Sequence, residues 1–434
     1  MKKSSTRRIA LNVLMDVTDR GKYAGLALKD ALFGMESSDA AFISALVYET
    51  LSSLKYVDFI ISSFARGSVK PVIRAILRLG VCQFVLMNAP AHVVCSESVK
   101  LTEEVGKAAL KGYVNGVMRN ICASDLEKLP LPDDTISRLS IRYSYPEFLV
   151  REYIELYGEE FTKDMLAYDG IGMTIRAQSP YTTEELTALL DERGIYYTQG
   201  KLVPDAIKLK RGFDPMRDER FINGQLTVQS ESAMLVCKLC GTHPGMLVLD
   251  ACAAPGGKTA YLSMLMGNTG HIDALELYEH RVKLIENTLS RLHVANVSVM
   301  SGDASVFDPE KCDKYDVVLV DAPCSGFGVT HKMDARYKKT SEDIDELCKI
   351  QFDILSNCGR YVKPGGALIY STCTISRREN EHVAELFLKT HDGFYVDMPD
   401  EFANNGSIGM QLFPHVHDTD GFYMVRFKRA SDIL

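Results

Sequence analysis

The second half of the chain constrains the fold most, because short apolar runs alternate there with longer segments of helical spacing. Residues 315–320 end in an unbroken apolar run, which is typical of a strand buried on both faces of a parallel sheet. Strands are expected at residues 246–249, 271–277, 297–300, 315–320 and 367–372, with helices at 258–266, 278–292 and 343–361. This alternation predicts a doubly wound, mostly parallel sheet, followed by an antiparallel pair at 406–412 and 422–427. Residues 376–379 read SRRE, the pattern of a capping box that would start a further helix.

The first part of the chain shows a different pattern, in which every apolar spacing is helical. Pro71 can open a helix at its first turn, with Ile73, Ile76 and Leu77 on the apolar face. The proline-rich stretch at residues 129–134 is a natural boundary. We therefore expect an all-helical domain at residues 1–135.

Residues 136–235 are expected to hold a helical linker and a small α/β module. After a helical stretch at 136–167, strands are predicted at 172–177, 194–198 and 206–209, with a helix at 182–193. A cap at Thr182 or Thr183 with Glu185 near the third position would start that helix. The size suits a ferredoxin-like split β-α-β module. The third domain is then residues 236–434, and a chain of 434 residues is long enough for several cores.

Net charge and cysteine usage limit the class of protein. A net charge of −8 argues against a nucleic-acid binder held by bulk charge. Local basic patches exist, although each by itself is more typical of a solvated surface; they are Arg7–Arg8, 208–211, 332–339 and 377–378. No apolar run approaches the roughly 20 residues that span a bilayer, and no secretory signal follows the basic start. Eleven cysteines then indicate reduced thiols in a cytoplasm.

Metal binding is not expected, although Cys237 and Cys240 have zinc-like spacing with His243 nearby. A matching second pair is absent, and the segment has the pattern of a helix end. We expect no metal in this protein.

Three acidic or glycine-containing segments follow successive strands of the predicted sheet. Residues 250–259 read DACAAPGGKT, in which glycines let the backbone approach a ligand and a helix N-terminus favours anionic groups. Glu276 ends the next strand, where an acid can accept both hydroxyls of a ribose, and Asp303 follows the third, where it could bind the amine of an adenine. Each acid alone is more typical of a surface or cap. Together, without a diphosphate fingerprint, they favour S-adenosylmethionine (SAM).

Two cysteines lie at the ends of the last two parallel strands. Cys324 lies in DAPCSG at residues 321–326, and Cys373 lies in STC at 371–373. A lone cysteine is most often inert and buried, which is our interpretation of Cys252, Cys348 and Cys358. Methylation of a pyrimidine carbon would explain a need for thiolate, because addition at C6 makes C5 of cytosine nucleophilic.

Asp321 lies beside the first of these cysteines and would hydrogen-bond the N3/N4 edge of the ring. The residues alone do not decide which thiol attacks the base. Enzymes that methylate exocyclic amines need no thiol, and their Asn/Asp-Pro-Pro-Tyr/Phe motif is absent.

In this order and at these strand ends, the segments DACAAPGGKT, DAPCSGFG and STCTI resemble the Sun family of RNA cytosine-C5 methyltransferases. Residues 90–92, 96–101 and 111–120 also resemble the NusB-like RNA-binding domain that precedes the catalytic part in one group of ribosomal RNA methyltransferases. The resemblance implies a C-terminal class I SAM methyltransferase fold, with Cys373 as nucleophile and Cys324 assisting proton removal and product release. It also implies a substrate cytosine in 16S ribosomal RNA. The implied cofactor site comprises Cys252, Ala253, Ala254, Pro255, Gly256, Gly257, Lys258, Glu276, Asp303 and Asp321.

The chain departs from the family pattern in two places. Residues 331–337 replace a basic loop that usually contains a proline, and an asparagine before Glu97 is absent. Two alternatives remain: the same chemistry on transfer RNA, or a non-catalytic RNA-binding factor of ribosome assembly. We expect a monomeric cytoplasmic enzyme.

Overall fold

The computed structural model describes residues 5–170, 172–209, 213–329, 336, 339–402 and 407–431. The chain divides into two compact units, Met1–Ala167 with His331–Lys339 and Tyr168–Thr330 with Thr340–Leu434. The boundaries predicted at 135/136 and 235/236 do not coincide with this division and stay predictions. Within the described ranges, no helix is long and apolar enough to cross a membrane.

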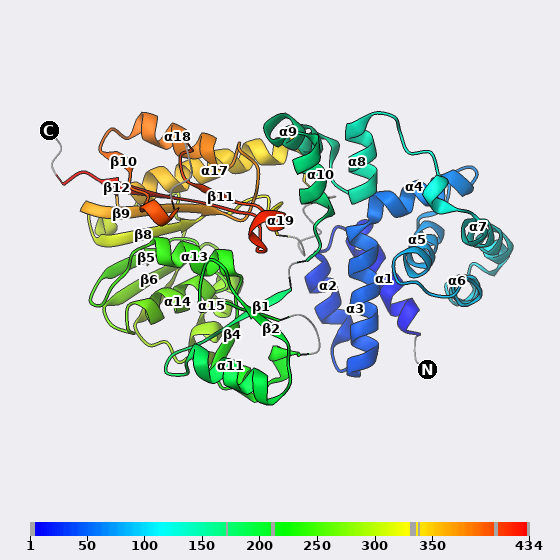
Figure 1. Cartoon of the computed structure of the whole chain (residues 1–434), viewed down its shortest axis with the longest axis horizontal. Coiled ribbons are helices and arrows are strands. Elements are labelled where there is room, and N and C mark those ends of the chain that lie inside the picture. The colour runs from blue at the N-terminus through cyan, green and yellow to red at the C-terminus, as the bar shows by residue number, and fades with distance from the viewer. Residues whose placement is uncertain are drawn as a thin grey trace. The chain divides into compact units, whose positions relative to one another are not determined.

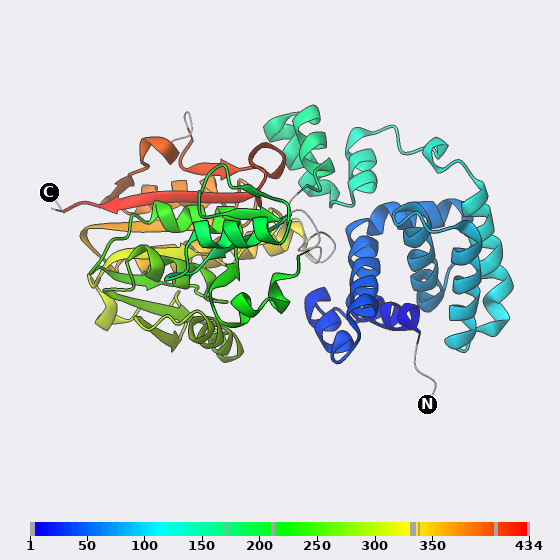
Figure 2. The ribbon, with the colours of Figure 1, turned by 60° about the horizontal axis from the view of Figure 1, so that its bottom comes forward.

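The described residues of the first unit form helices joined by loops and contain no strand, as the sequence predicts (Figure 2). Gly80 lies where this bundle is tightest: a Cβ there would meet Ser98 Oγ at 2.9 Å and the side chain of Met118 at 3.0 Å. Glycine therefore lets α5 approach α6 and α7 closely. The helices are α1 (Thr6–Thr18), α2 (Ala24–Leu32), α3 (Ser37–Ser52), α4 (Leu54–Phe64), α5 (Pro71–Val85), α6 (Ala91–Glu104), α7 (Lys111–Ala123), α8 (Thr135–Tyr143), α9 (Glu147–Tyr157) and α10 (Glu159–Ala167), with 3₁₀ turns at Ala108–Leu110 and Leu126–Lys128.

The second unit begins with a small antiparallel sheet of order β2-β3-β1-β4, formed by β1 (Met173–Ala177), β2 (Tyr197–Gln199), β3 (Ile207–Leu209) and β4 (Leu226–Val228). With α11 (Thr183–Glu192), a 3₁₀ turn (Pro215–Arg217) and α12 (Glu219–Ile222), this is the predicted ferredoxin-like module. The capping box of Thr182 and Glu185 is confirmed.

Two details of this module differ from the sequence prediction. The strand expected at 194–198 begins later, because Gly194 adopts a φ of +62° and Ile195 N still donates to Leu190 O at 2.8 Å. Strand β4 was not predicted, because its three residues are too few to show a period.

The large sheet has the order β10-β12-β9-β8-β5-β6-β7, with β11 paired to β12. Its centre is parallel, and β12 adds to β9 in the antiparallel sense, which confirms the doubly wound sheet and the terminal pair. The strands are β5 (Leu247–Asp250), β6 (His271–Glu276), β7 (Val297–Ser301), β8 (Tyr315–Asp321), β9 (Val362–Thr372), β10 (Phe394–Val396), β11 (Met410–Leu412) and β12 (Phe422–Arg429).

Helices cover both faces of this sheet (Figure 1). Val318 and Val320 pack with α17 and α18, whereas Val317 and Leu319 pack with α13 and α14, as expected when side chains alternate along a strand. All four residues are nearly inaccessible to water, which explains the apolar run in the sequence. The helices are α13 (Glu231–Leu239), α14 (Gly257–Leu265), α15 (Glu279–Arg291), α17 (Ser341–Gly359), α18 (Glu381–Thr390) and α19 (Pro414–His417), with 3₁₀ turns at Pro309–Lys311 and Asp400–Phe402.

Candidate active site

The two predicted thiols meet at the carboxyl ends of β8 and β9. These strands pair in parallel with Asp321 opposite Ser371, so their loops leave the sheet side by side. Ala322 N donates to Ser371 O at 2.9 Å and extends the pairing into the loops. The Sγ atoms of Cys324 and Cys373 are then 3.1 Å apart, and Cys373 N donates to Cys324 Sγ at 3.3 Å. One substrate atom could therefore be in reach of both thiols.

A lysine and an aspartate stand beside this pair of thiols. Lys258, in the first turn of α14, donates to Asp321 Oδ2 at 2.7 Å, and Ser371 Oγ donates to Asp321 Oδ1 at 3.0 Å. Burial lowers the pKa of Lys258, but the ion pair and hydrogen bond with Asp321 outweigh burial, so the net pKa lies above the usual range. The site therefore holds a permanent cation paired with Asp321.

The glycine-containing loop connects β5 to α14. Gly256 has a φ of +97°, and a Cβ there would lie 3.3 Å from the Cα of Ile285, so only glycine fits without strain. Ala253 N donates to Leu275 O at 3.0 Å and holds the loop against β6. The loop thus leads into the N-terminus of α14, where backbone N–H groups are available to a ligand.

Asp250, at the end of β5, is completely buried. Thr259 Oγ1 donates to its Oδ2 at 2.7 Å, while its Oδ1 has no hydrogen-bond partner among the described residues. Burial raises the pKa of Asp250 to about 6, and the hydrogen bond from Thr259 only partly offsets this rise. An acceptor left unsatisfied at this depth fits a site whose donor comes from a ligand.

The two other predicted acids lie at the ends of β6 and β7. Glu276 is 3% exposed, and its Oε1 accepts from Tyr278 N at 3.3 Å and from Arg281 Nη1 at 3.1 Å. Asp303 makes only a local turn, in which its Oδ1 accepts from Ser305 N at 2.9 Å and Ser305 Oγ at 2.7 Å. The acids therefore stand in the predicted order along the edge of the sheet that also carries the thiols.

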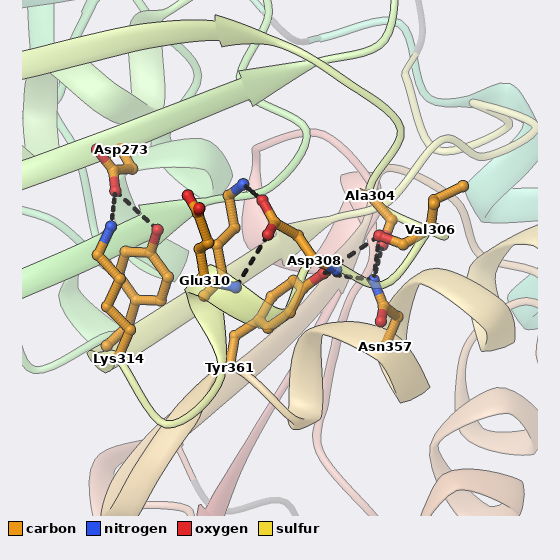
Figure 3. Close-up of polar contacts among 10 residues, drawn as sticks. Asp273, Ala304, Val306, Asp308, Glu310, Lys314, Asn357 and Tyr361 are labelled. Carbon is orange, nitrogen blue, oxygen red and sulfur yellow. Dashed lines mark hydrogen bonds and ion pairs between the residues drawn. The ribbon is translucent and has the colours of Figure 1, made fainter.

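Side chains from α17 and its end fix the loop that follows β7 (Figure 3). Asn357 Nδ2 donates to the backbone oxygens of Ala304 and Val306 at 2.7 and 3.0 Å. Asp308 N donates to the hydroxyl of Tyr361 at 2.8 Å, and Asn357 Nδ2 also donates to that hydroxyl at 2.9 Å. Sequence reasoning missed Asn357, because an asparagine inside a helical pattern carries no signal of its distant partner.

Glu379 binds the loop that carries Cys324, although its sequence pattern predicts another role. The stretch 376–379 was expected to be a capping box that starts a helix, and this expectation is wrong, because α18 begins at Glu381 with Asn380 at its N-cap and no side-chain cap bond. Glu379 is completely buried and accepts from Ser325 N at 2.8 Å and from Gln351 Nε2 at 3.0 Å. The partners of Glu379 are distant in sequence, so the local motif could not reveal them.

Burial raises the pKa of three further thiols of the second unit, those of Cys237, Cys252 and Cys358. Cys237 Sγ donates to Ala233 O at 3.3 Å, so this thiol is hydrogen-bonded within α13. Burial raises the pKa of Cys358 to about 12 and the pKa of Cys252 well above its usual value. These thiols therefore stay protonated at neutral pH. The predicted burial is found for Cys358, whereas Cys252 and Cys348 are partly exposed.

Several members of the basic patches are engaged within the protein. Arg7 Nε donates to Gln83 at 2.8 Å, and Lys208 Nζ lies 2.8 Å from the buried carboxylate of Glu231. Arg378 pairs with Asp345. Residues 210–211, 332–335 and 337–338 of the patches, and most of the departing loop at 331–337, lie outside the described residues.

Comparisons with known proteins agree with this arrangement. Residues 239–428 match the family model described as 16S rRNA methyltransferase RsmB/F, and residues 4–123 match the NusB family. The chain is 34% identical to "Probable ribosomal RNA small subunit methyltransferase B" of Bacillus subtilis, covering 99% of this chain and 100% of that protein. It is 29% identical to ribosomal RNA small subunit methyltransferase B of Shewanella oneidensis, with coverages of 98% and 99%.

A solved structure also shares the fold. The methyltransferase homologue protein from Pyrococcus horikoshii has a TM-score of 0.59 and 26% identity, covering 69% of this chain and all of that chain. The fold predicted for the second half of the chain is thus found in a methyltransferase homologue.

Proposed function

The chain belongs to the RsmB/F family of SAM-dependent 16S rRNA methyltransferases, and we propose that it methylates C5 of one cytosine in 16S ribosomal RNA through a covalent cysteine adduct. The observation that carries this proposal is the pair of thiols, 3.1 Å apart between Sγ atoms, at the ends of two adjacent parallel strands. Nitrogen methylation would give no role to either thiol. Carbon methylation requires one to attack and leaves a task for the second.

The first step assigns the attack to Cys373. Its thiolate adds to C6 of the cytosine, and the electrons of the C5=C6 double bond move to C5, which becomes nucleophilic. The ammonium of Lys258 and a thiolate at Cys373 attract each other, so the site favours the reactive form. Bound SAM supplies the electrophilic methyl group that C5 receives.

Asp321 would orient the base during this step. Its two oxygens already accept from Lys258 and Ser371, which fixes the plane of the carboxylate. A carboxylate held this way can still accept from the N3/N4 edge of the ring, and preorganised groups of this kind stabilise the charge that develops during addition.

The second step assigns release to Cys324. The proton on C5 must leave, the electrons of that C–H bond re-form C5=C6, and the bond from C6 to Cys373 breaks. Cys324 Sγ lies 3.1 Å from Cys373 Sγ, so a thiolate there is near the same carbon atoms and can assist proton removal. The roles of the two thiols rest on the family resemblance, because the distance between their sulfurs does not decide which one attacks.

The residues present fit SAM. Glu276 would accept from the ribose hydroxyls and Asp303 from the adenine amine, since both stand at strand ends with remaining acceptor capacity. The loop of residues 252–257 would pass close to the methionine part of SAM. Lys258 follows this loop in the first turn of α14. The buried Oδ1 of Asp250, without a hydrogen-bond partner among the described residues, supports this assignment because it keeps acceptor capacity.

The RNA would be bound by the parts outside the large sheet. We assign RNA binding to the NusB-like residues 1–135 and to the module within residues 136–235, while residues 236–434 carry the chemistry. The target base must leave its stack to reach half-buried thiols, and this is cheapest in loops and ends of RNA. The enzyme would act as a cytoplasmic monomer.

A denaturing gel tests the proposal. Wild type, Cys324→Ser and Cys373→Ser are each incubated with SAM and 16S RNA, and protein–RNA adducts and methyl transfer are scored. We expect a stable adduct with Cys324→Ser, none with Cys373→Ser, and turnover only with wild type.

Other outcomes select among the alternatives. A reversed pattern would exchange the roles of the thiols and keep the C5 chemistry. Absence of both adduct and methyl transfer on 16S RNA would reject this substrate, and the same assay on transfer RNA would then decide between the second candidate and a non-catalytic assembly factor.

A further inference from the structure

The geometry points to Glu379 as a positioning residue that holds the two catalytic thiols at their working separation by binding the loop of Cys324. Glu379 does not touch either sulfur in the contacts described above. It acts on the residues next to them. This inference rests on the proposed function, since it assigns the release step to a correctly placed Cys324.

The contacts of Glu379 surround Cys324 on both sides. Ser325 donates to Glu379 through its N–H at 2.8 Å and through its Oγ at 2.5 Å. Gln351 Nε2 donates to Glu379 at 3.0 Å and to Pro323 O at 2.9 Å. The residues before and after Cys324 are thus fastened to one carboxylate, directly or through one amide.

The same network reaches the second thiol. Ser325 Oγ lies 2.9 Å from Thr374 Oγ1, so the residue after Cys324 is joined to the residue after Cys373. Both hydroxyl-bearing residues are nearly or fully buried, as is Glu379. A buried carboxylate costs several kcal/mol unless it is hydrogen-bonded, and here Ser325 and Gln351 supply those hydrogen bonds.

Loss of the Glu379 carboxylate should displace the loop of Cys324 and not only lower the stability of the fold. Loss of the carboxylate leaves the N–H of Ser325 and the amide of Gln351 buried without their acceptor, and the loop is expected to shift to satisfy them. A shift of about 1 Å at a reacting group can cost about a hundred-fold in rate. Thr372, the residue before Cys373, stays paired with Tyr423 of β12, so the loss should fall on the step of Cys324.

The test compares Glu379→Ala, Glu379→Gln and Glu231→Ala in the full-length enzyme. Glutamine can keep one oxygen toward Ser325 N–H and Gln351 and turn its NH₂ to Ser325 Oγ, so Glu379→Gln should restore most of the function. Glu231 is the matched control: it is also completely buried and accepts from Leu202 N and Val203 N at 2.6 and 2.9 Å. Folding of each variant is checked by its melting transition and by its affinity for SAM.

In the adduct gel, Glu379→Ala should accumulate protein–RNA adduct although Cys324 is present, with kcat lowered about a hundred-fold and the KM for SAM unchanged. Glu231→Ala should lose stability without accumulating adduct. Turnover and adduct levels equal to wild type in folded Glu379→Ala would overturn the inference, and so would equal accumulation in Glu231→Ala.

A second readout needs no RNA. Phenylarsine oxide binds two thiols only when they are close together, and wild type should bind it at the pair of Cys324 and Cys373, whereas Glu379→Ala should bind it much more weakly. If Cys324→Ser gives no adduct, the proposed division of roles fails. The arsenical measurement then still decides whether Glu379 sets the separation of the thiols, because retained binding in Glu379→Ala would reject it.

Discussion

The carboxyl edge of the large sheet contains two halves that are built in opposite ways. In the cysteine half, the loops after β8 and β9 are tied together by buried side chains, so Glu379, Ser325 and Gln351 satisfy one another. In the acid half, after β5 to β7, Asp250 keeps an unsatisfied oxygen and Asp303 makes only a local turn. The difference teaches that groups which must hold a geometry are saturated from within, whereas groups which must bind a ligand keep capacity for it.

The largest effect that this comparison predicts is the loss of methyl transfer when Cys373 is replaced. Cys373→Ser should lower methyl transfer by at least about 10⁴-fold, because removal of a covalent nucleophile abolishes the path rather than slowing it. Single-turnover transfer from labelled SAM to 16S RNA measures this loss. The affinity for SAM should not change, since Cys373 belongs to the cysteine half. A comparable loss of SAM affinity would break the division into halves.

The next effect concerns Lys258, which starts in the acid half and reaches Asp321 in the cysteine half. Lys258→Met removes the cation near Cys373 and leaves Asp321 half-buried without its charge partner. We expect adduct formation to slow by about 10²–10³-fold, the usual cost of losing one preorganised electrostatic group. The rate of adduct formation in the Cys324→Ser background measures it.

The matched control is Lys238→Met. Lys238 lies on α13, and its Nζ is 3.6 Å from Asp205 Oδ2. It should change the rate of adduct formation little. Equal slowing in both variants would show that general charge, and not the ion pair with Asp321, supports the thiolate.

The sequence predicted the strand ends well because each local signal there coincides with its structural cause. The apolar run of β8 is buried on both faces, and Gly256 occupies a conformation that only glycine adopts easily. It placed the thiols and the acids at the right edge for the same reason. These positions follow from alternation of strand and helix, which is visible in one dimension.

The supporting residues could not be predicted, because their partners are distant in sequence. Glu379 bonds to Ser325, which lies 54 positions earlier, and its pattern with Ser376 imitates a helix cap. Asn357 bonds to the loop after β7 across 53 positions and has no local signature. The basic patch at 208–211 was interpreted as a solvated surface, but Lys208 is buried and paired with Glu231.

A third prediction uses the unsatisfied acid. The pKa of Asp250 is raised by burial to about 6 from 3.8, so the folded protein keeps this proton to a higher pH than the unfolded chain does. Its contribution to stability is fully present below about pH 4 and is lost as the pH rises to about 6, a change of about 3 kcal/mol. Chemical denaturation from pH 4 to 7 should show this decline in wild type and a flatter profile in Asp250→Asn.

The opposite sign is expected at the other edge of the sheet. Burial raises the pKa of Asp316, but Leu247 N and Lys363 outweigh it, so the net pKa is lowered. Its contribution to stability is present at neutral pH and is lost as the pH falls. Asp316→Asn should therefore lose stability at pH 7, and an identical response of both variants would contradict the assignment of Asp250 to a ligand-binding edge.

The smallest effect tests whether the acid half also needs support from within. Asn357→Leu removes the donor to Ala304 O and Val306 O, so the loop that carries Asp303 loses its anchor. We expect the Kd for SAM, measured by calorimetry, to rise about tenfold, equivalent to about 1.4 kcal/mol. The adduct chemistry at saturating SAM should be unchanged, because Asn357 does not contact the cysteine loops in the contacts described above.

Asn296 provides the matched comparison for this last change, because it precedes β7 and donates to Thr269 O at 3.0 Å at the opposite edge of the sheet. Asn296→Leu should reduce stability by about 1–3 kcal/mol, as loss of a partly buried amide does, without a change in SAM affinity. If Asn357→Leu also left SAM affinity unchanged, the loop of Asp303 would not be a binding element. The acid half would then be reduced to Asp250 and Glu276, and the ligand would be held mainly by its ribose end.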